Sequence, residues 1–330
     1  MPTKFAGNDW ILDFASQGIP TGERVLIKID PKKPIFNTLS DLGMRDKMQV
    51  QLKQLLNSND SMFIFSAPAG QGLPTTWRVG LESADRFVRD FHSVQDVRLN
   101  EPEQINIGLH TYDGAAGETP MTVLKSLLLK QPDALVLPDF VNAEVVKLMM
   151  EEIIDEHRYV ITRLNAGSAV EALLRLLATY TGSAKEIIKT TCGVLNQRLI
   201  RRLCTTCRQP FQPTPQLLQK LGIPPGRVQV LYQPFIPPPP EQRVDANGKP
   251  IEIQICPNCD GRGYFGRAAI FELLVLNDEI RHALQTKPSP DVITKVARQN
   301  GFLTMQEEGV LSVATGLTSL QELQRVLSGK

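Results

Sequence analysis

The sequence predicts an α/β protein whose core is a largely parallel sheet covered by helices. Between residues 61 and 180, short apolar runs alternate with helix-like segments, which is the rhythm of this fold class. A glycine-rich loop, "SAPAGQGLPTT" (66–76), includes the end of the first of these runs. Two C-x-x-C pairs further along the chain indicate a metal-binding segment in addition to the sheet.

Local patterns predict the individual elements in chain order. Apolar or alternating runs predict strands at 24–30, 61–67, 96–101, 134–139 and 158–164. Helical periodicity predicts helices near 45–57, 75–91, 119–130, 143–156, 169–180, 184–203, 277–286, 289–300, 304–314 and 318–328. Between the cysteine pairs, four consecutive prolines and the turn "DANGK" predict an exposed loop or hairpin at 234–254.

The composition is that of an ordinary soluble globular protein, with 42% hydrophobic and 22% charged residues among 330. A net charge of +1 creates no global field that would attract nucleic acid or anionic lipid. No apolar run approaches the roughly 18–20 residues that span a bilayer, and "MPTKFAGNDW" lacks the apolar core of a signal peptide. We therefore expect a cytoplasmic protein with no membrane span and no nucleic-acid partner.

The glycine loop resembles a phosphate-binding loop that has lost its charged residues. Such a loop reads G-x-x-x-x-G-K-[S/T], and here Leu73 and Pro74 occupy the last two places. The N–H groups of Gly70, Gln71 and Gly72 still lie at a predicted helix N-terminus, where they could form a weak nucleotide-binding nest. On the loop alone, an ordinary structural turn is the favoured alternative.

The cysteines predict a closed metal site. Cys204, Cys207, Cys256 and Cys259 can supply four thiolates in a tetrahedron, which is the arrangement of structural zinc. Iron is an alternative that the ligands do not exclude, and four unligated thiols are another. The fifth cysteine, Cys192, has no partner at metal-ligand spacing and is interpreted as a small buried hydrophobe.

Three downstream segments carry a family resemblance. "NQRLIRRLCTTC" (196–207), "CPNCDGRGYFGRAAIFELL" (256–274) and "GFLTMQEEGVLSVATGLTSLQELQRVL" (301–327) closely resemble the C-terminal region of the secretion and pilus assembly ATPases, namely the type II secretion E proteins and type IV pilus extension motors. "GERVLIKI" followed by "LSDLGM" resembles the segment that precedes their P-loop. The resemblance covers about residues 20–328.

This resemblance implies a RecA-like P-loop ATPase core with a tetracysteine metal module and a C-terminal helical portion. The implied division is a remnant of the N-terminal domain plus linker (1–57), the core (58–195), the metal module with its proline-rich insert (196–272) and the helical portion (273–330). Family members usually carry more sequence in front, so we expect a shortened member or a fragment.

The resemblance also locates four nucleotide-binding boxes, and all four depart from the family pattern. The Walker A lysine and threonine fall on Leu73 and Pro74. The acidic box falls on 100–104, where Glu101 keeps an acid in the aspartate's place. In the Walker B region Asp139 stands where the family has glutamate, and the histidine of the last box is Asn165. We interpret this as loss of ATP hydrolysis with retention of the scaffold.

The surviving candidates for catalysis are Glu101, Asp139 and Arg163, each with a simpler interpretation. Glu101 is also consistent with a solvated or helix-capping acid, and Asp139 with a cap on the helix that begins near Ala143. Arg163 ends a predicted strand, where it would pair with Asp139 or with a phosphate. His110 and His157 are interpreted as lone structural histidines.

The preferred function is therefore that of a non-hydrolysing subunit of a type II secretion or type IV pilus system. It would work through protein contacts, either in a homo- or hetero-oligomeric (hexameric) ring with an active motor subunit or by docking on the inner-membrane platform protein. The alternative is an active ATPase in which Arg163 replaces the lysine and Asp139 serves as the base. Nucleotide binding without hydrolysis lies between the two.

Overall fold

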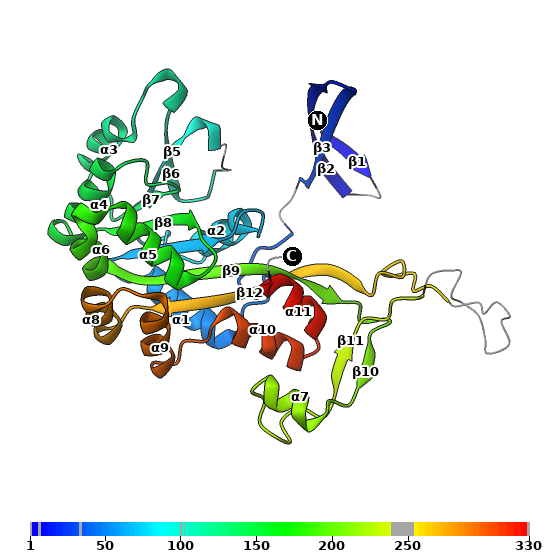
Figure 1. The fold of residues 1–330 in the computed structure, drawn as a ribbon. Helices are drawn as coiled ribbons and strands as arrows, with labels where there is room; N and C mark the ends of the chain where they lie inside the picture. The colour runs from blue at the N-terminus through cyan, green and yellow to red at the C-terminus, as the bar shows by residue number, and fades with distance from the viewer. Residues whose placement is uncertain are drawn as a thin grey trace, which may run out of the picture.

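A seven-stranded sheet organises the chain, shown in Figure 1 as a computed structural model. The structure describes residues 2–5, 8–32, 35–99, 101, 103–238 and 254–328. The spatial order of the strands is β12 (Tyr264–Val275), β9 (Thr191–Leu203), β4 (Met62–Ala67), β8 (Tyr159–Asn165), β7 (Ala134–Leu137), β5 (Phe91–Asp96) and β6 (Ile107–Tyr112). All neighbours are parallel except β12 and β9. The expected α/β fold with a largely parallel sheet is confirmed.

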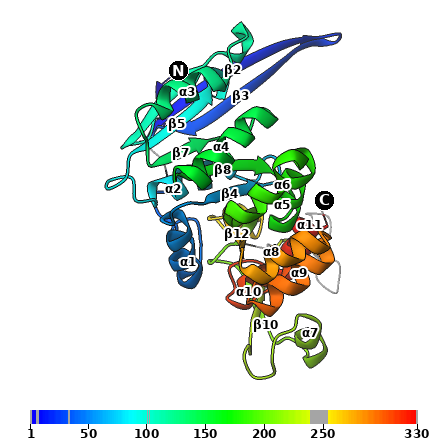
Figure 2. The same cartoon turned by 90° about the vertical axis from the view of Figure 1, so that its left-hand side faces the viewer.

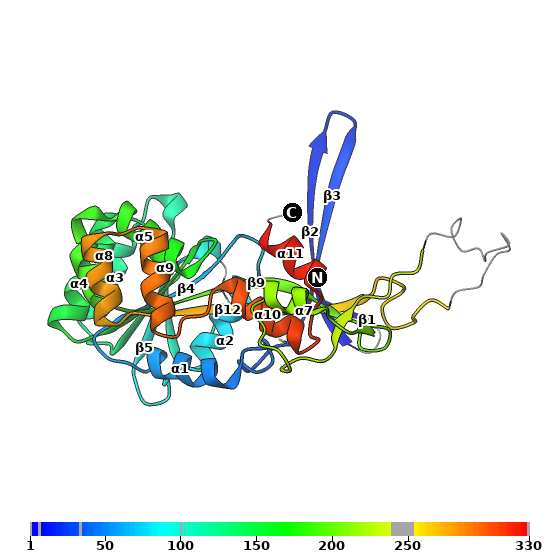
Figure 3. The same cartoon turned by 60° about the horizontal axis from the view of Figure 1, so that its bottom comes forward.

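Helices cover both faces of this sheet (Figure 3). The helices of the described residues are α1 (Asp46–Leu56), α2 (Leu73–Glu82), α3 (Pro120–Leu128), α4 (Ala143–Asp155), α5 (Ala169–Thr179), α6 (Ala184–Thr190), α7 (Pro215–Lys220), α8 (Asp278–Thr286), α9 (Pro290–Gln299), α10 (Met305–Ala314) and α11 (Leu320–Leu327). Among them, α7 lies away from the main sheet (Figure 1). Short 3₁₀ turns lie at Val97–Leu99, Gly114–Ala116 and Thr181–Ser183.

The alternation of side chains along β4 divides the core into two apolar clusters. Met62 and Ile64 face one side, where they pack with residues of α3, α4, α5, α6, α8 and α9. Phe63 and Phe65 face the other side, where they pack with residues of α1 and α2. All four side chains are fully buried, as expected for a central parallel strand with both faces covered.

Two smaller sheets lie outside the main one. In the first, β1 (Pro2–Phe5), β2 (Asn8–Ile19) and β3 (Gly22–Pro31) form an antiparallel sheet that projects away from the body in Figures 1 and 3. In Figure 2 it overlaps the body in projection, and the tip of the β2–β3 hairpin extends past it. The sequence predicted only the strand at 24–30, because β2 mixes polar and apolar residues without a clear period. The second sheet pairs β10 (Gln209–Phe211) with β11 (Leu231–Gln233).

The largest error of the sequence prediction concerns the helix expected at 184–203. Only Ala184–Thr190 is helical, and Thr191–Leu203 is the long strand β9. Its apolar residues recur at a spacing that also suits a helix, but β4 and β12 flank the strand and bury it. β9 and β12 therefore cross the boundaries expected at residues 195 and 272, and both belong to the main sheet.

Two smaller predictions were also wrong. The helix expected at 75–91 ends at Glu82, since the chain must turn before it enters the sheet again as β5. The strand expected at 96–101 is instead β5, which ends at Asp96 and is followed by a 3₁₀ turn. The loop predicted at 234–254 falls mainly outside the described residues. None of the helices in the described ranges combines the length and hydropathy needed to cross a bilayer.

A buried carboxylate fastens the last helix to the sheet. Glu322, near the start of α11, is fully buried. It accepts hydrogen bonds from the backbone N–H of Arg201 (3.0 Å) and from the guanidinium groups of Arg201 and Arg325 (2.8 Å each). Burial by itself would raise its pKa, but the hydrogen bonds from Arg325 and Arg201 outweigh burial and lower the pKa to about 2.

This carboxylate predicts an acid-dependent loss of stability. Its contribution is complete above the unfolded pKa of about 4.3 and is lost as the pH falls toward about 2, because the folded state resists protonation. Urea denaturation should show that the free energy of unfolding of the wild type falls between about pH 5 and pH 3. We expect a smaller fall in Glu322→Gln, which has no carboxylate to protonate at this position. The surface variant Glu156→Gln should behave as wild type, and an unchanged pH slope in Glu322→Gln would contradict the assignment.

Candidate functional site

The predicted nucleotide-box residues gather at the edge formed by the carboxyl ends of the parallel strands. The glycine loop follows β4, Asp139 lies two residues after β7, and Arg163 lies near the end of β8. This is the edge at which open α/β sheets bind ligands. Of the acidic box at 100–104, residues 100 and 102 are outside the described residues.

The glycine loop is held in place by β9. β9 pairs with β4 only as far as Asn196, and beyond that point the side chain of Gln71 takes the place of β4. Its Oε1 accepts from the N–H of Leu199 (2.9 Å), while the carbonyl of Gln71 accepts from Nε2 of Gln197 (2.7 Å). The N–H of Gln71 donates to Pro68 within the loop (3.2 Å). One of the three donors predicted for an anion is therefore already used.

The two glycines shape the turn into α2. Gly70 and Gly72 have φ of 75° and 82°, in the left-handed region that favours glycine. A Cβ on Gly72 would lie 3.3 Å from both Gln197 Nε2 and Leu199 Cδ1, so the residue also permits the close approach of β9.

Leu73 stands at the lysine position of the phosphate-binding pattern and belongs to the apolar core. The side chain of Leu73 is 8% exposed and packs in the cluster that contains Trp77 and Phe65. Pro74 is exposed in the first turn of α2, where its missing N–H costs no helical hydrogen bond. Leu73 therefore contributes apolar packing at the place where the phosphate-binding pattern has a lysine.

Arg163 is already paired. Its Nη2 donates to Oε1 of Glu101 at 2.6 Å, and its guanidinium lies 5.1 Å from the centre of the Trp77 ring. Both side chains of the ion pair are largely buried, at 11% and 16% exposure. The expected partner, Asp139, is not the residue that Arg163 binds. The interpretation of Glu101 as a solvated or capping acid is also wrong.

Asp139 lines a surface depression of about 450 Å³ together with Asp96, Arg98 and Tyr112. Although Asp139 is exposed at the mouth, neighbouring atoms desolvate it enough to raise its pKa, and the carboxylates of Glu101 and Asp96 add to this. It does not cap α4, because Asn142 fills that role by accepting from the N–H of Val145 at 3.0 Å.

Asp96 is a site residue that the sequence analysis missed. It is the last residue of β5 and is buried, with its carboxylate held by two hydrogen bonds from Arg98 at 2.8 and 2.6 Å. These bonds lower its pKa to about 2. Residues 91–96, "FHSVQD", mix apolar and polar side chains and gave no clear strand signal, and our strand at 96–101 began where β5 ends.

A polar network joins the strands behind this edge. The side chain of Asn196 donates to Ser66 (2.9 Å) and to the carbonyl of Ala166 (3.0 Å). Within the described ranges, the buried side-chain oxygens without a hydrogen-bond partner include those of Thr162, Asn196 and Gln197. Such acceptors are usually satisfied by water or by a ligand.

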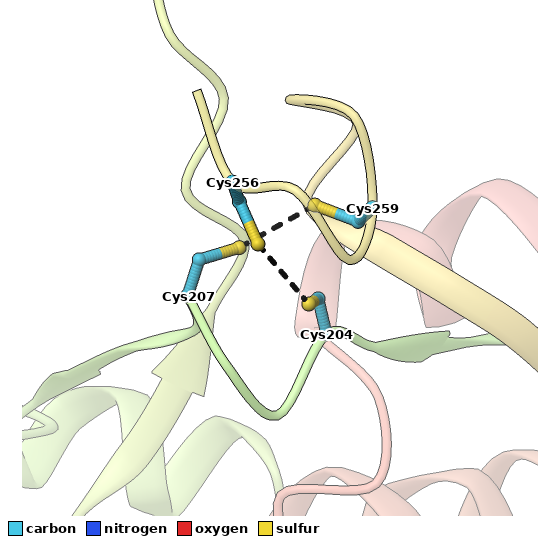
Figure 4. Close-up of side chains that lie close together, drawn as sticks. All are labelled: Cys204, Cys207, Cys256 and Cys259. Atoms are coloured by element: carbon cyan, nitrogen blue, oxygen red, sulfur yellow. Dashed lines mark hydrogen bonds between the residues drawn. The ribbon is translucent and has the colours of Figure 1, made fainter. Parts of the chain in front are cut away.

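The four predicted metal ligands come together, as Figure 4 shows. Their sulfur atoms all lie within 4.8 Å of one another, with Cys204–Cys256 at 3.8 Å and Cys207–Cys259 at 3.5 Å. Tetrahedral bonds of about 2.3 Å place thiolate sulfurs about 3.8 Å apart. The distances therefore fit a metal ion, and the cysteines are free thiols rather than disulfides.

Backbone hydrogen bonds shape the two cysteine turns. One pair follows β9 and the other precedes β12, and the N–H of Cys204 donates to the carbonyl of Gly263 across them (3.0 Å). Within each turn, Arg208 donates to Cys204 and Asp260 to Cys256, both at 2.9 Å. The antiparallel pairing of β9 with β12 thus delivers both turns to one place.

The electrostatics of the cluster are compatible with a bound cation. Burial would raise the pKa of Cys204, but a hydrogen bond from the side chain of Asn258 and two from backbone N–H groups lower it to about 6. Burial and the neighbouring thiols raise the pKa of Cys207. Four thiols this close cannot all ionise unless a positive charge lies between them.

Sequence comparison now identifies the family. The family model described as "Type II/IV secretion system protein" matches residues 8–325. The chain belongs to this family. The resemblance to the secretion and pilus family that the sequence indicated is therefore confirmed.

Named relatives support the same assignment. The chain is 28% identical to the type IV pilus assembly ATPase PilB of Thermus thermophilus over 318 residues, covering 94% of the chain and 33% of the relative. It is 28% identical to the type II secretion system protein E of Pectobacterium carotovorum over 306 residues, covering 92% and 56%. The chain thus spans a third to about half of these curated relatives.

Solved structures show the same fold. The Legionella pneumophila ATPase DotB matches with a TM-score of 0.59 at 12% identity, covering 100% of this chain and 76% of that one. The pilus retraction motor PilT with bound ADP matches with a TM-score of 0.55 at 13% identity, covering 96% and 77%.

The cysteine geometry predicts one bound metal ion per chain. We expect elemental analysis of protein purified without added metal to find a stoichiometric ion, because four sulfurs at these distances form a complete ligand set. Cys256→Ser should lose most of it, whereas Cys192→Ser should retain it because Cys192 lies outside the cluster. Metal-free wild type, or equal metal content in both variants, would contradict this prediction.

Proposed function

We propose that this chain is a non-hydrolysing member of the secretion/pilus ATPase family that acts as a structural or regulatory subunit. It would keep the RecA-like P-loop core as a scaffold without its chemistry. The observation that carries the proposal is the state of the edge, where Leu73 is packed in the apolar core and Arg163 is bound to Glu101. Leu73 has no charge to offer a phosphate, and the charge of Arg163 is already paired with Glu101.

Charge accounts for the expected loss of nucleotide affinity. A bound triphosphate needs cations at its outer phosphates and a hydroxyl that holds Mg²⁺. Arg163 and Arg98 are each held by an acid, Glu101 and Asp96, so each would have to leave its partner to reach an anion. The remaining backbone N–H groups of the loop supply only partial charges, which supports weak binding at best.

The family's acidic box can also be aligned with the end of β5 instead of residues 100–104. Gln95 and Asp96 end β5 and are both buried, whereas Glu101 lies beyond the 3₁₀ turn. If the box, E-D-P-x-E in the family, begins at Gln95, its aspartate is retained as Asp96, its first glutamate is an amide and its last is Leu99. Either register leaves the box without its two glutamates.

The cysteine cluster would hold zinc in a structural role. All four ligand positions are occupied by cysteine, so no position is open for a substrate or a reactive water. A zinc ion here would fasten the ends of β9 and β12, and through β9 it would support the position of the glycine loop.

The implied partners are other subunits of the same machinery. We place the chain in a homo- or hetero-oligomeric ring with active motor subunits, or on the inner-membrane platform protein of a secretion or pilus system. It would be cytoplasmic and would reach the inner membrane only through these partners.

An active ATPase with an unconventional site is the second candidate function. The observation in its favour is Asp139, whose pKa is raised beside an open depression. A carboxyl group in such a setting is suited to accept a proton from water.

Nucleotide calorimetry and a turnover assay distinguish the two functions. On metal-replete protein with Mg²⁺, we expect no measurable binding of ATP or ADP at millimolar concentration and no phosphate release above background. The reason is that Leu73 and Pro74 stand where a P-loop has its lysine and the hydroxyl that holds Mg²⁺. Turnover that disappears in Asp139→Ala and persists in the neighbouring variant Val141→Ala would overturn the proposal in favour of the active enzyme.

A further inference from the structure

Two histidines far apart in the sequence meet on the surface of β5 and β6. Nδ1 of His92 lies 3.0 Å from Nε2 of His110, and the ring centres are 5.1 Å apart. The interpretation of His110 as a lone histidine is therefore wrong. Both side chains are half-buried, at the edge of the sheet opposite β12 and the cysteine cluster.

The arrangement of β5 and β6 leaves space for this contact. His92 is opposite Gly108 in the register of the two parallel strands. A Cβ on Gly108 would lie 2.5 Å from Nδ1 of His92, so any larger residue would displace the ring. His110, two residues further along β6, then faces the free nitrogen of His92.

A carboxylate fixes the tautomer of the first ring. Nε2 of His92 lies 3.0 Å from Oδ2 of Asp90. Since a carboxylate only accepts, Nε2 carries the proton, and neutral His92 presents Nδ1 as a lone pair toward His110. This is the carboxylate–histidine arrangement that orients and strengthens histidine ligands in metal sites.

We propose that His92 and His110 form a second metal-binding site, independent of the cysteine cluster, for a divalent transition ion of tetragonal preference such as Ni²⁺ or Cu²⁺. The ion would bind Nδ1 of His92 and Nε2 of His110, with water in its remaining positions. The proton on Nε2 of His110 would move to its Nδ1, so both imidazoles bind as neutral ligands. This site does not depend on the proposed function.

The separation of the nitrogens selects the class of metal. Across 3.0 Å, bonds of about 2.0–2.1 Å to both nitrogens subtend about 94° at the ion. This is close to the right angle of square-planar and tetragonal sites and smaller than the tetrahedral angle that zinc prefers. Imidazole suits nickel and copper, whereas the four thiolates of the cysteine cluster suit zinc.

The surrounding charges are compatible with a bound cation. Asp90 lies against His92, and Asp133 accepts from the N–H of Asp90 at 2.7 Å. In the part of the chain that the structure describes, three or more potential ligands converge only at the cysteines, so the histidine site keeps open positions for water.

Nickel titration of the zinc-loaded, untagged chain tests the proposal. We expect one Ni²⁺ to bind per chain with no release of zinc, and the melting temperature to rise with nickel concentration because only the folded state holds the two rings together. His92→Gln and His110→Gln should each abolish this binding. Asp90→Asn should weaken it by about tenfold to a hundredfold, as loss of an orienting partner does.

The chain supplies its own controls. His157 also contacts a carboxylate, with Nδ1 3.2 Å from Oδ2 of Asp60, but its side chain is exposed. His157→Gln and His282→Gln should bind nickel as wild type does. Gly108→Ala keeps both imidazoles but displaces one ring, and it should lose binding while retaining its circular dichroism spectrum. Absence of one-to-one binding in wild type, its persistence in His92→Gln, or its loss in His157→Gln would overturn the proposal.

Discussion

The register of β9 between β4 and β12 is the constraint on which both candidate sites depend. Within the sheet, Asn196 fixes this register by its hydrogen bonds to Ser66 and to the carbonyl of Ala166. Beyond Asn196 the strand holds the glycine loop through Gln71, and at its end it carries Cys204. A slip of one residue would turn every one of these side chains to the opposite face.

This dependence explains why the glycine loop keeps its shape without a phosphate-binding lysine. In a nucleotide site, part of the loop's order comes from the ligand, which takes up the backbone N–H groups. Here the order comes from the protein, because the amide of Gln71 continues the ladder of β9 and Leu73 anchors the first turn of α2 in the core. Contacts within the protein thus hold the loop between β4 and α2.

The sequence predicted the parts of this structure that depend on local patterns. β4, α4 and the four C-terminal helices lie where hydrophobic periodicity predicts them, and the cysteine cluster was predicted from the two C-x-x-C pairs. β9 was missed because its apolar spacing also suits a helix, and only pairing with two distant strands decides between the two. The same limit applies to side-chain partners: nothing local to Arg163 indicates Glu101, 62 residues away, or links His92 to His110.

The charged side chains at the sheet edge are paired with one another in the structure without a ligand. The ion pair of Arg163 and Glu101 is largely buried, and its guanidinium also rests on Trp77. A phosphate that recruited Arg163 would leave the Glu101 carboxylate buried without a partner, and breaking a buried pair in this way costs about 3–5 kcal/mol. Leu73 offers no charge in compensation, and the pairing therefore supports the proposal that nucleotide binding at this edge is weak.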